Sequence, residues 1–218
     1  MKSAFSLRSA IMALLLCAAP MTATLAAAAI DDSTPQKLIE TSSKVLFDDL
    51  DANRAKYHKD VTALHKSVRE NFLPYMDVDY AAQQVLGKHW RTATPEQRKR
   101  FVTAFYTSLL KTYGEALVDF SGDRMKILPF QGDPAAPRAS VRTEIRRSNG
   151  ATVAVAYSVR KNEAGTWKVW DVVIEGISYV KSFREQFGLE IEQKGLDALL
   201  QRLESGVNPV VVTPPAKG

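Results

Sequence analysis

The chain contains a single cysteine, Cys17, and its position limits the chemistry that the protein can perform. Cys17 lies inside an apolar run at residues 10–19 that follows a basic start. The alanines that end at Ala29 offer A-x-A cleavage frames, so residues 1–29 are predicted to be a secretory signal peptide. Cleavage there leaves 189 residues and no cysteine, which excludes disulfides and thiol chemistry. A chain of this length can fold without disulfides, and the type of signal indicates a bacterial periplasm.

Long hydrophobic runs are absent after the signal peptide, since no segment approaches the roughly 20 apolar residues that cross a bilayer. Loss of Lys2 and Arg8 with the signal lowers the formal net charge from +5 to +3. The one basic block, Arg98-Lys99-Arg100, alternates with apolar residues on a predicted helix, which is typical of a solvated helix face. The sequence therefore favours neither a membrane span nor a nucleic-acid-binding surface.

Motifs for catalysis and metal binding are missing as well. The sequence has no G-x-S-x-G, no P-loop and no G-x-G-x-x-G. The three histidines, His58, His65 and His89, are dispersed, and a helix cap predicted at Asp60 separates the first two. A zinc site is therefore not expected.

Two carboxylates, Asp171 and Glu175, lie on or just after the last predicted strand. One interpretation makes either a general base in a hydrophobic cleft, because burial raises a carboxyl pKa. The other is that Asp171 pairs with an arginine or caps a backbone group, and it is favoured because no acid–base partner is identifiable nearby. Tyr157 and Tyr179 can donate hydrogen bonds in a pocket, but core tyrosines with satisfied hydroxyls are commoner. No catalytic residue is assigned.

Helical periodicity dominates the first half of the mature chain. Three helices are predicted over residues 34–52, 60–74 and 77–90, with a polar connection at 51–59. The strongest local signal is the capping box formed by Thr94 and Gln97 with Pro95 between them. It predicts a helix from Pro95 to about Asp119, rich in aromatic residues, as the main helix that covers the sheet.

Four antiparallel strands in a meander are predicted next, with a tight turn at Asn149-Gly150. They cover residues 124–130, 139–147, 151–160 and 167–174. Glu175-Gly176 breaks the last strand, and a closing helix begins at Ile177 and ends near Gly188. A further amphipathic segment covers residues 191–203, and residues 207–218 are predicted to be a disordered tail. The result is one domain, residues 30–206, of the α+β class.

The last predicted strand is apolar on both faces. Strict alternation places Trp167, Val169, Asp171 and Val173 on one face and Lys168, Trp170, Val172 and Ile174 on the other. Such a strand is covered by helices on both sides or lines a cavity. On the preceding strand, the small residues Ala154, Ala156 and Ser158 either let a helix approach closely or leave a void. Close helix packing is the simpler interpretation, and an apolar cavity is the more specific one.

The sequence resembles the MlaC (toluene-tolerance) family of periplasmic phospholipid-binding proteins over roughly Pro35 to Leu203. No single motif is specific, but their order and spacing together are. The residues that carry the resemblance are Leu73-Pro74-Tyr75, Val85-Leu86-Gly87 with Trp90, Ala93 to Arg98 with Phe101, Trp167-Val169-Asp171, Glu175-Gly176-Ile177-Ser178, and Gln193, Gly195, Leu196 and Asp197.

The resemblance implies a soluble monomeric carrier that holds the acyl tails of a phospholipid in a deep pocket between sheet and helices, in outline an NTF2-like arrangement. It implies bound phospholipid as cargo, no cofactor and no catalytic site. The implied partners are an outer-membrane lipoprotein–porin complex and an inner-membrane ABC transporter with a lipid-channel subunit. The implied process is maintenance of outer-membrane lipid asymmetry.

The pocket is predicted to be lined by the helix at 95–119, the segment at 72–90 and one face of the last two strands. The predicted lining residues are Phe72, Tyr75, Leu86, Phe105, Leu109, Val155, Tyr157, Trp170, Val172 and Ile174. Two alternatives remain: an enzyme with a pocket in an isomerase-like fold, and a periplasmic interaction protein with a filled core.

Overall fold

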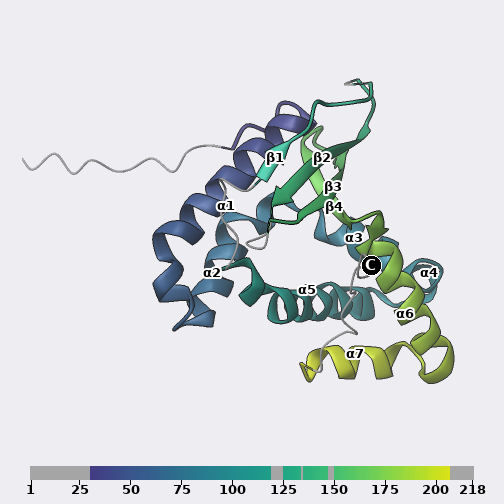
Figure 1. The fold of residues 1–218 in the computed structure, drawn as a ribbon. Coiled ribbons are helices and arrows are strands. Elements are labelled where there is room, and N and C mark those ends of the chain that lie inside the picture. Colours follow the sequence, from purple (N-terminus) through teal and green to yellow (C-terminus); the bar gives the residue numbers. More distant parts are fainter. Residues whose placement is uncertain (1–29, 119–124, 134, 147–149, 207–218) are drawn as a thin grey trace, which may run out of the picture.

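A computed structural model describes residues 30–118, 125–133, 135–146 and 150–206 (Figure 1). The predicted signal peptide, the predicted tail and Asn149 of the predicted hairpin turn lie outside these residues. The fold is α+β, as predicted, and its helices precede and follow one open antiparallel sheet.

The N-terminal half is helical and the C-terminal half begins with the sheet. The helices before the sheet are α1 (Pro35–Tyr57), α2 (Val61–Asn71), the 3₁₀ turn η1 (Leu73–Tyr75), α3 (Val78–Leu86), α4 (His89–Thr92) and α5 (Pro95–Leu117). The strands are β1 (Met125–Ile127), β2 (Arg138–Arg146), β3 (Thr152–Lys161), β4 (Trp167–Ile174) and β5 (Ile177–Ser178), and α6 (Tyr179–Lys194) and α7 (Leu196–Glu204) follow.

The helix starts follow the predicted capping residues. Asp60 and Asp77 accept hydrogen bonds from backbone amides of α2 and α3. At α5, the Thr94 hydroxyl accepts from the amide of Gln97 at 3.1 Å, and the Gln97 side chain accepts from the amide of Thr94 at 3.0 Å. The predicted capping box is therefore confirmed.

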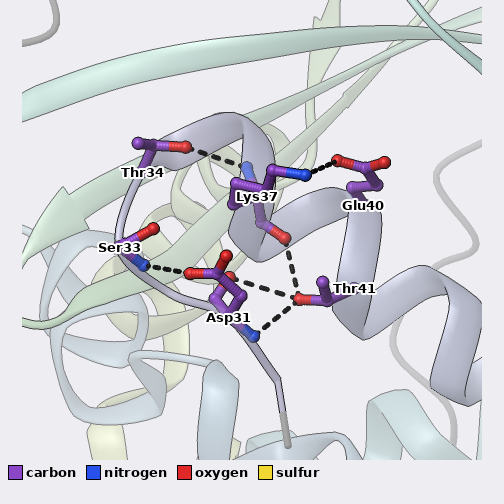
Figure 2. A network of polar contacts seen from close by, with 6 residues as sticks. All are labelled: Asp31, Ser33, Thr34, Lys37, Glu40 and Thr41. Atoms are coloured by element: carbon purple, nitrogen blue, oxygen red, sulfur yellow. Dashed lines mark hydrogen bonds and ion pairs between the residues drawn. The ribbon is translucent and has the colours of Figure 1, made fainter. Parts of the chain in front are cut away.

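The segment just after the predicted cleavage point is tied to α1 (Figure 2). The Thr34 hydroxyl caps the amide of Lys37, and the Thr41 hydroxyl accepts from the amide of Asp31 at 3.0 Å. The Asp31 carboxylate accepts from the amide of Ser33, and hydrogen bonds from Ser33 lower its pKa. Residues 31–34 are therefore joined to the first turns of α1 by hydrogen bonds.

Helix α1 continues five residues beyond its predicted end at residue 52, so the polar connection predicted for 51–59 is wrong over most of its length. Tyr57 is buried, and its hydroxyl donates to Asp49 at 2.7 Å. Packing of this one tyrosine therefore extends the helix through a polar stretch. The third predicted helix is instead split into α3 and α4 at Gly87, whose φ is +53°.

The sheet is a meander in which each strand pairs with the next, in the order β1 to β5. It has one strand more than predicted, because Ile177 and Ser178 pair back onto β4 before α6 begins. Glu175 and Gly176 both have positive φ, +50° and +83°, as a two-residue turn between twisted strands requires.

A β-bulge in β4 corrects the predicted alternation of that strand. Val159 of β3 pairs with Val169, whereas the preceding Ser158 pairs with Asp171, so Trp170 is an extra residue. Side chains after the bulge therefore change faces relative to strict alternation. The inner face, which packs on α1 at one end, consists of Met125, Ile127, Ala139, Val141, Thr143, Ile145, Val153, Val155, Tyr157, Val159, Trp167, Val169, Val172 and Ile174.

The opposite, outer face carries the charged residues. It consists of Lys126, Arg138, Ser140, Arg142, Glu144, Arg146, Thr152, Ala154, Ala156, Ser158, Arg160, Lys168, Asp171 and Val173. Ala154 is exposed and Ala156 is partly exposed, so the small residues of β3 do not line the inner face as a void.

The closing helix α6 runs through Gly188 to Lys194, so the end predicted at Gly188 is wrong. The chain turns instead at Gly195, whose φ is +83°, and α7 then packs back on α5 and α6. Figure 1 shows α7 below α5, and α5 across the molecule from the sheet. The main contacts of α5 in the described chain are with α2, α3 and α7.

The buried apolar residues of the described chain form three separate clusters. The helical cluster joins α3, α5, α6 and α7, the sheet cluster joins the start of α1 to one end of the inner face, and the third joins α1, α2 and α5. A chain with one filled core would show one continuous cluster.

Candidate functional site

The inner face of the sheet is packed at one end and open at the other. At the packed end, Leu38 and Ile39 of α1 contact Val141, Val159 and Trp167. At the other end, the three apolar clusters of the described chain leave out five inner-face residues. These residues, called here the open end, are Ile145, Val153, Val155, Val172 and Ile174.

Side chains at the open end are apolar but incompletely covered. Val155 is 6% exposed, while Ile145, Val153, Val172 and Ile174 are partly exposed. Water against aliphatic side chains is unfavourable by about 25 cal/mol per Å². This end of the sheet therefore offers a surface that an apolar ligand would stabilise.

Tyr157 lies at the boundary between the two ends. It packs against the sheet cluster and sits opposite Val172 of β4. Burial raises the pKa of its hydroxyl, and a hydrogen bond with the Thr143 side chain partly offsets this effect. The Thr143 hydroxyl donates to the carbonyl of Val155 at 3.1 Å, so the buried polar atoms here are used within the sheet.

The ten predicted lining residues do not come together in one place. Val155, Tyr157, Val172 and Ile174 share the inner face, in agreement with a common wall. Trp170 leaves that set because of the bulge: its ring packs edge-on against Tyr80, 5.4 Å between centroids, and Tyr80 contacts Arg160 of the outer face.

The predicted helical residues are divided among the clusters. Leu86 and Phe105 are 2% and 4% exposed within the helical cluster, and Leu109 packs against it. Phe72 packs against the cluster of α1, α2 and α5, and Tyr75 packs against the sheet cluster.

Sequence reasoning did not assign Ile145 and Val153 to the lining, although their signal was present. Alternation along each strand puts Val153 on the same face as Val155 and Tyr157, and the register pairs Val153 with Ile145 across β2 and β3. A second omission is Tyr113 of α5, whose ring meets Tyr179 of α6 with centroids 5.9 Å apart. That contact joins α5 to the start of α6, two residues after Ile177, which pairs with Ile174 of the open end.

The two candidate carboxylates are held by backbone groups. Asp171 is 5% exposed and accepts from the amide of Val180 at 3.0 Å and from the hydroxyl of Ser178 at 2.6 Å. The interpretation that Asp171 caps a backbone group is confirmed. Glu175 accepts from the amide of Ala154 at 2.6 Å. Both carboxylates therefore fix the junction of β3, β4 and α6.

Two further features bear on function within the described residues. No three His, Cys, Asp or Glu side chains gather there as a metal site, and no helix there is long and apolar enough to cross a membrane. A surface hollow of about 330 Å³ lies between α5 and α7. Charged and hydroxyl side chains such as Lys99, Arg100, Thr103 and Glu204 line it together with the apolar Ala104 and Leu203.

One known protein family matches most of this chain. A family model described as MlaC protein matches residues 40–205. The chain belongs to the MlaC family. The resemblance inferred from the sequence is thereby confirmed.

Two relatives and one solved structure are similar to this MlaC family member over most of its length. The intermembrane phospholipid transport system binding protein MlaC of Haemophilus influenzae is 28% identical over 186 residues, covering 84% of this chain and 87% of the relative. The toluene tolerance protein ttg2D of Pseudomonas putida is 33% identical over 165 residues, covering 75% and 76%. A phospholipid-binding protein from Ralstonia solanacearum, solved in complex with a phospholipid, has a TM-score of 0.73 and 25% identity, covering 81% of this chain and 97% of that one.

Proposed function

We propose that this chain is a periplasmic phospholipid carrier that moves lipid between the outer and inner membranes and so maintains outer-membrane lipid asymmetry. The acyl tails lie against the open end of the inner sheet face. Support comes from membership of the MlaC family, from relatives named for phospholipid transport, and from a similar structure that was solved with a phospholipid.

The observation that carries the proposal is that the apolar clusters of the described chain leave out one end of the inner sheet face. Val172 and Ile174 of β4 and Val153 of β3 present aliphatic side chains that the three clusters of the described chain do not incorporate. Helix α5 lies across the molecule from the sheet, and its main contacts in the described chain are with α2, α3 and α7 (Figure 1). In an interaction protein with a filled core, the protein's own side chains would cover this apolar surface. In a carrier, the acyl chains of the bound lipid cover it.

Energetics favour a carrier that does not release its lipid into water. Burying about 30 methylenes at about 0.8 kcal/mol each stabilises the complex by roughly 25 kcal/mol relative to water. Relative to a bilayer most of this cancels, because the tails move between two apolar media. The carrier can therefore exchange lipid with membrane proteins without its own energy source, and the direction of transport is set by its partners.

The partners in this proposal are an outer-membrane lipoprotein–porin complex and an inner-membrane ABC transporter with a lipid-channel subunit. Residues 1–29 direct export, and residues 30–206 are the lipid-binding domain. Asp171 and Glu175, the two candidate acid–base residues, accept hydrogen bonds from backbone amides, which supports a binding protein rather than an enzyme.

The test is extraction of the purified mature protein with organic solvent, followed by mass spectrometry of the extract. We expect phospholipid at a fixed ratio to protein, with little head-group preference because tail contacts are non-directional. An extract without lipid from protein purified out of membrane-containing cells would contradict the proposal.

A further inference from the structure

Three cationic residues lie in one row across the outer face of the sheet. Arg138 of β2 is opposite Arg160 of β3, and Arg160 is opposite Lys168 of β4. Opposite residues on neighbouring strands have Cβ atoms about 5 Å apart, and like charges at this distance destabilise the sheet. The fold therefore carries an electrostatic cost at this position.

The neighbouring segment compensates only part of this charge. Asp77 pairs with Arg160 at 2.6 Å, and it is the acidic residue that reaches the row among the described ion pairs. The other two cations have uncharged acceptors: Arg138 donates to the Tyr80 hydroxyl at 2.9 Å, and Lys168 donates to the carbonyl of Pro74 at 2.7 Å. The row and its ion-pair partner together keep two positive charges.

The side chains of the row are held in place. The Arg160 guanidinium lies 4.1 Å from the ring centroid of Tyr80, and the Lys168 ammonium lies 5.5 Å from that of Tyr75. The segment that carries both tyrosines is itself fixed to the sheet, because the amide of Asp77 donates to the carbonyl of Val169 at 2.7 Å. Cations fixed before binding lose less side-chain entropy when they meet an anion.

We propose that the row formed by Arg138, Arg160 and Lys168 docks the protein on an acidic protein surface. The inference rests on the proposed function, in which the carrier must dock on a membrane complex that gives or takes lipid. Prepositioned guanidinium and ammonium groups suit the carboxylates of a folded partner. Carboxylates from such a partner would replace the missing counter-charges and remove the cost of the row.

An anionic membrane is the less suitable occupant of this surface. Peripheral binding to lipid combines basic residues with apolar side chains that insert into the interface. In the described chain the large apolar residue that is well exposed is Leu189, 60% exposed, and it belongs to α6 rather than to the row. The row has charge and rigid geometry but no such anchor.

The test compares two double variants that each remove two positive charges. Arg138→Gln with Lys168→Gln neutralises the row but leaves the Asp77–Arg160 pair. Lys126→Gln with Arg146→Gln removes two exposed charges from the same face near the other end of β2. Binding of a labelled poly-glutamate peptide is measured by fluorescence anisotropy, and vesicles of phosphatidylglycerol are the membrane probe.

We expect the row variant to bind poly-glutamate about tenfold more weakly and to lose most of its salt dependence, while the control pair changes far less. The charge-preserving exchange of Arg138→Lys with Lys168→Arg should restore binding. Equal losses in both double variants, no binding of poly-glutamate by the unaltered protein, or binding to vesicles alone would overturn the proposal.

Lipid content separates this inference from the proposed function. Mass spectrometry of the same preparations should show unchanged phospholipid in the row variant. Protein that binds the peptide through the row but contains no lipid refutes the carrier function and leaves the docking surface standing. Thermal unfolding followed by circular dichroism verifies that the compared variants are folded.

Discussion

Tyr157 of β3 and Val172 of β4 lie opposite each other in the sheet, where the packed part of the inner face gives way to its open end. The pair fixes the direction of Val172 toward the inside, whereas strict alternation along β4 places it on the face of Lys168, opposite Trp167 and Val169. The next residue, Val173, belongs to the outer face and pairs with Ser178. Two adjacent valines of equal size therefore point to opposite sides of the proposed lipid site.

Replacing each of these two valines with glutamate tests which face of the sheet binds the lipid. Val172→Glu should abolish lipid loading while the fold survives, because an unpaired carboxylate against acyl chains costs several kcal/mol. Val173→Glu is the matched control and should keep normal lipid, since its side chain is on the outer face. Phospholipid per protein is measured by mass spectrometry after solvent extraction. Normal loading of Val172→Glu, or equal losses in both variants, would show that the inner face is not the lipid face.

The helical cluster should matter for stability. Phe105 stacks on Phe101 with centroids 5.4 Å apart and meets Phe183 edge-on at 5.3 Å. Phe105→Ala should therefore lower the free energy of unfolding by about 3–5 kcal/mol, measured by urea denaturation. The exposed Leu189 is the control, and Leu189→Ala should change stability by less than about 0.5 kcal/mol. Similar effects of the two substitutions would contradict the packing described here.

Asp171 should be a structural residue. Replacement by alanine leaves the amide of Val180 without its acceptor and should cost about 2–3 kcal/mol of unfolding free energy. Asp171→Asn keeps an acceptor oxygen and should cost less. Both variants should still carry lipid when folded. Loss of lipid from a fully stable Asp171→Asn protein would instead indicate a direct role in binding.

His65 predicts a dependence of stability on pH. Its Nε2 atom is buried without a hydrogen-bond partner in the described structure, and burial lowers its pKa from 6.5, with Arg69 adding to the effect, Glu115 opposing it and Lys111 contributing least. The unfolded chain therefore takes up this proton at a higher pH than the folded chain. The stabilisation is present above about pH 6.5 and is lost as the pH falls toward the folded-state pKa.

Urea titrations between about pH 7 and about pH 5 check this expectation. The loss of unfolding free energy over that range should be smaller in His65→Gln than in the unaltered protein. His58 is exposed at the end of α1, and His58→Gln should leave the loss unchanged. The same slope in His65→Gln would exclude His65 as its source.

Local chemistry made much of the fold predictable. The capping side chains of Thr94 and Asp60 act within one helical turn, so their neighbours in the sequence are sufficient to place the helix starts. The end of α1 was missed because it depends on Tyr57, whose burial and hydrogen bond to Asp49 are tertiary contacts. Gly188 was misassigned for a similar reason: Phe187 and Ile191 are buried on either side of it and keep α6 continuous.

The candidate site was predictable only in part. Alternation placed Val155 and Tyr157 correctly on one face of β3, because β3 itself contains no extra residue. It failed for Trp170 because one extra residue in β4 reverses the alternation, and nothing in the sequence from Val169 to Ile174 marks where that residue is inserted. A bulge is a property of pairing between strands, so it is visible only when the register is known.

The most direct test of the central claim is to map where the tails lie. Mature protein is loaded with a phospholipid that carries a photoactivatable diazirine near the end of one acyl chain, irradiated and digested, and the adducts are located by mass spectrometry. The account predicts adducts on β3 and β4 at the open end, among Val153, Val155, Val172 and Ile174. Adducts confined to the hollow between α5 and α7, or to the outer face around Arg142 and Ala156, would contradict it.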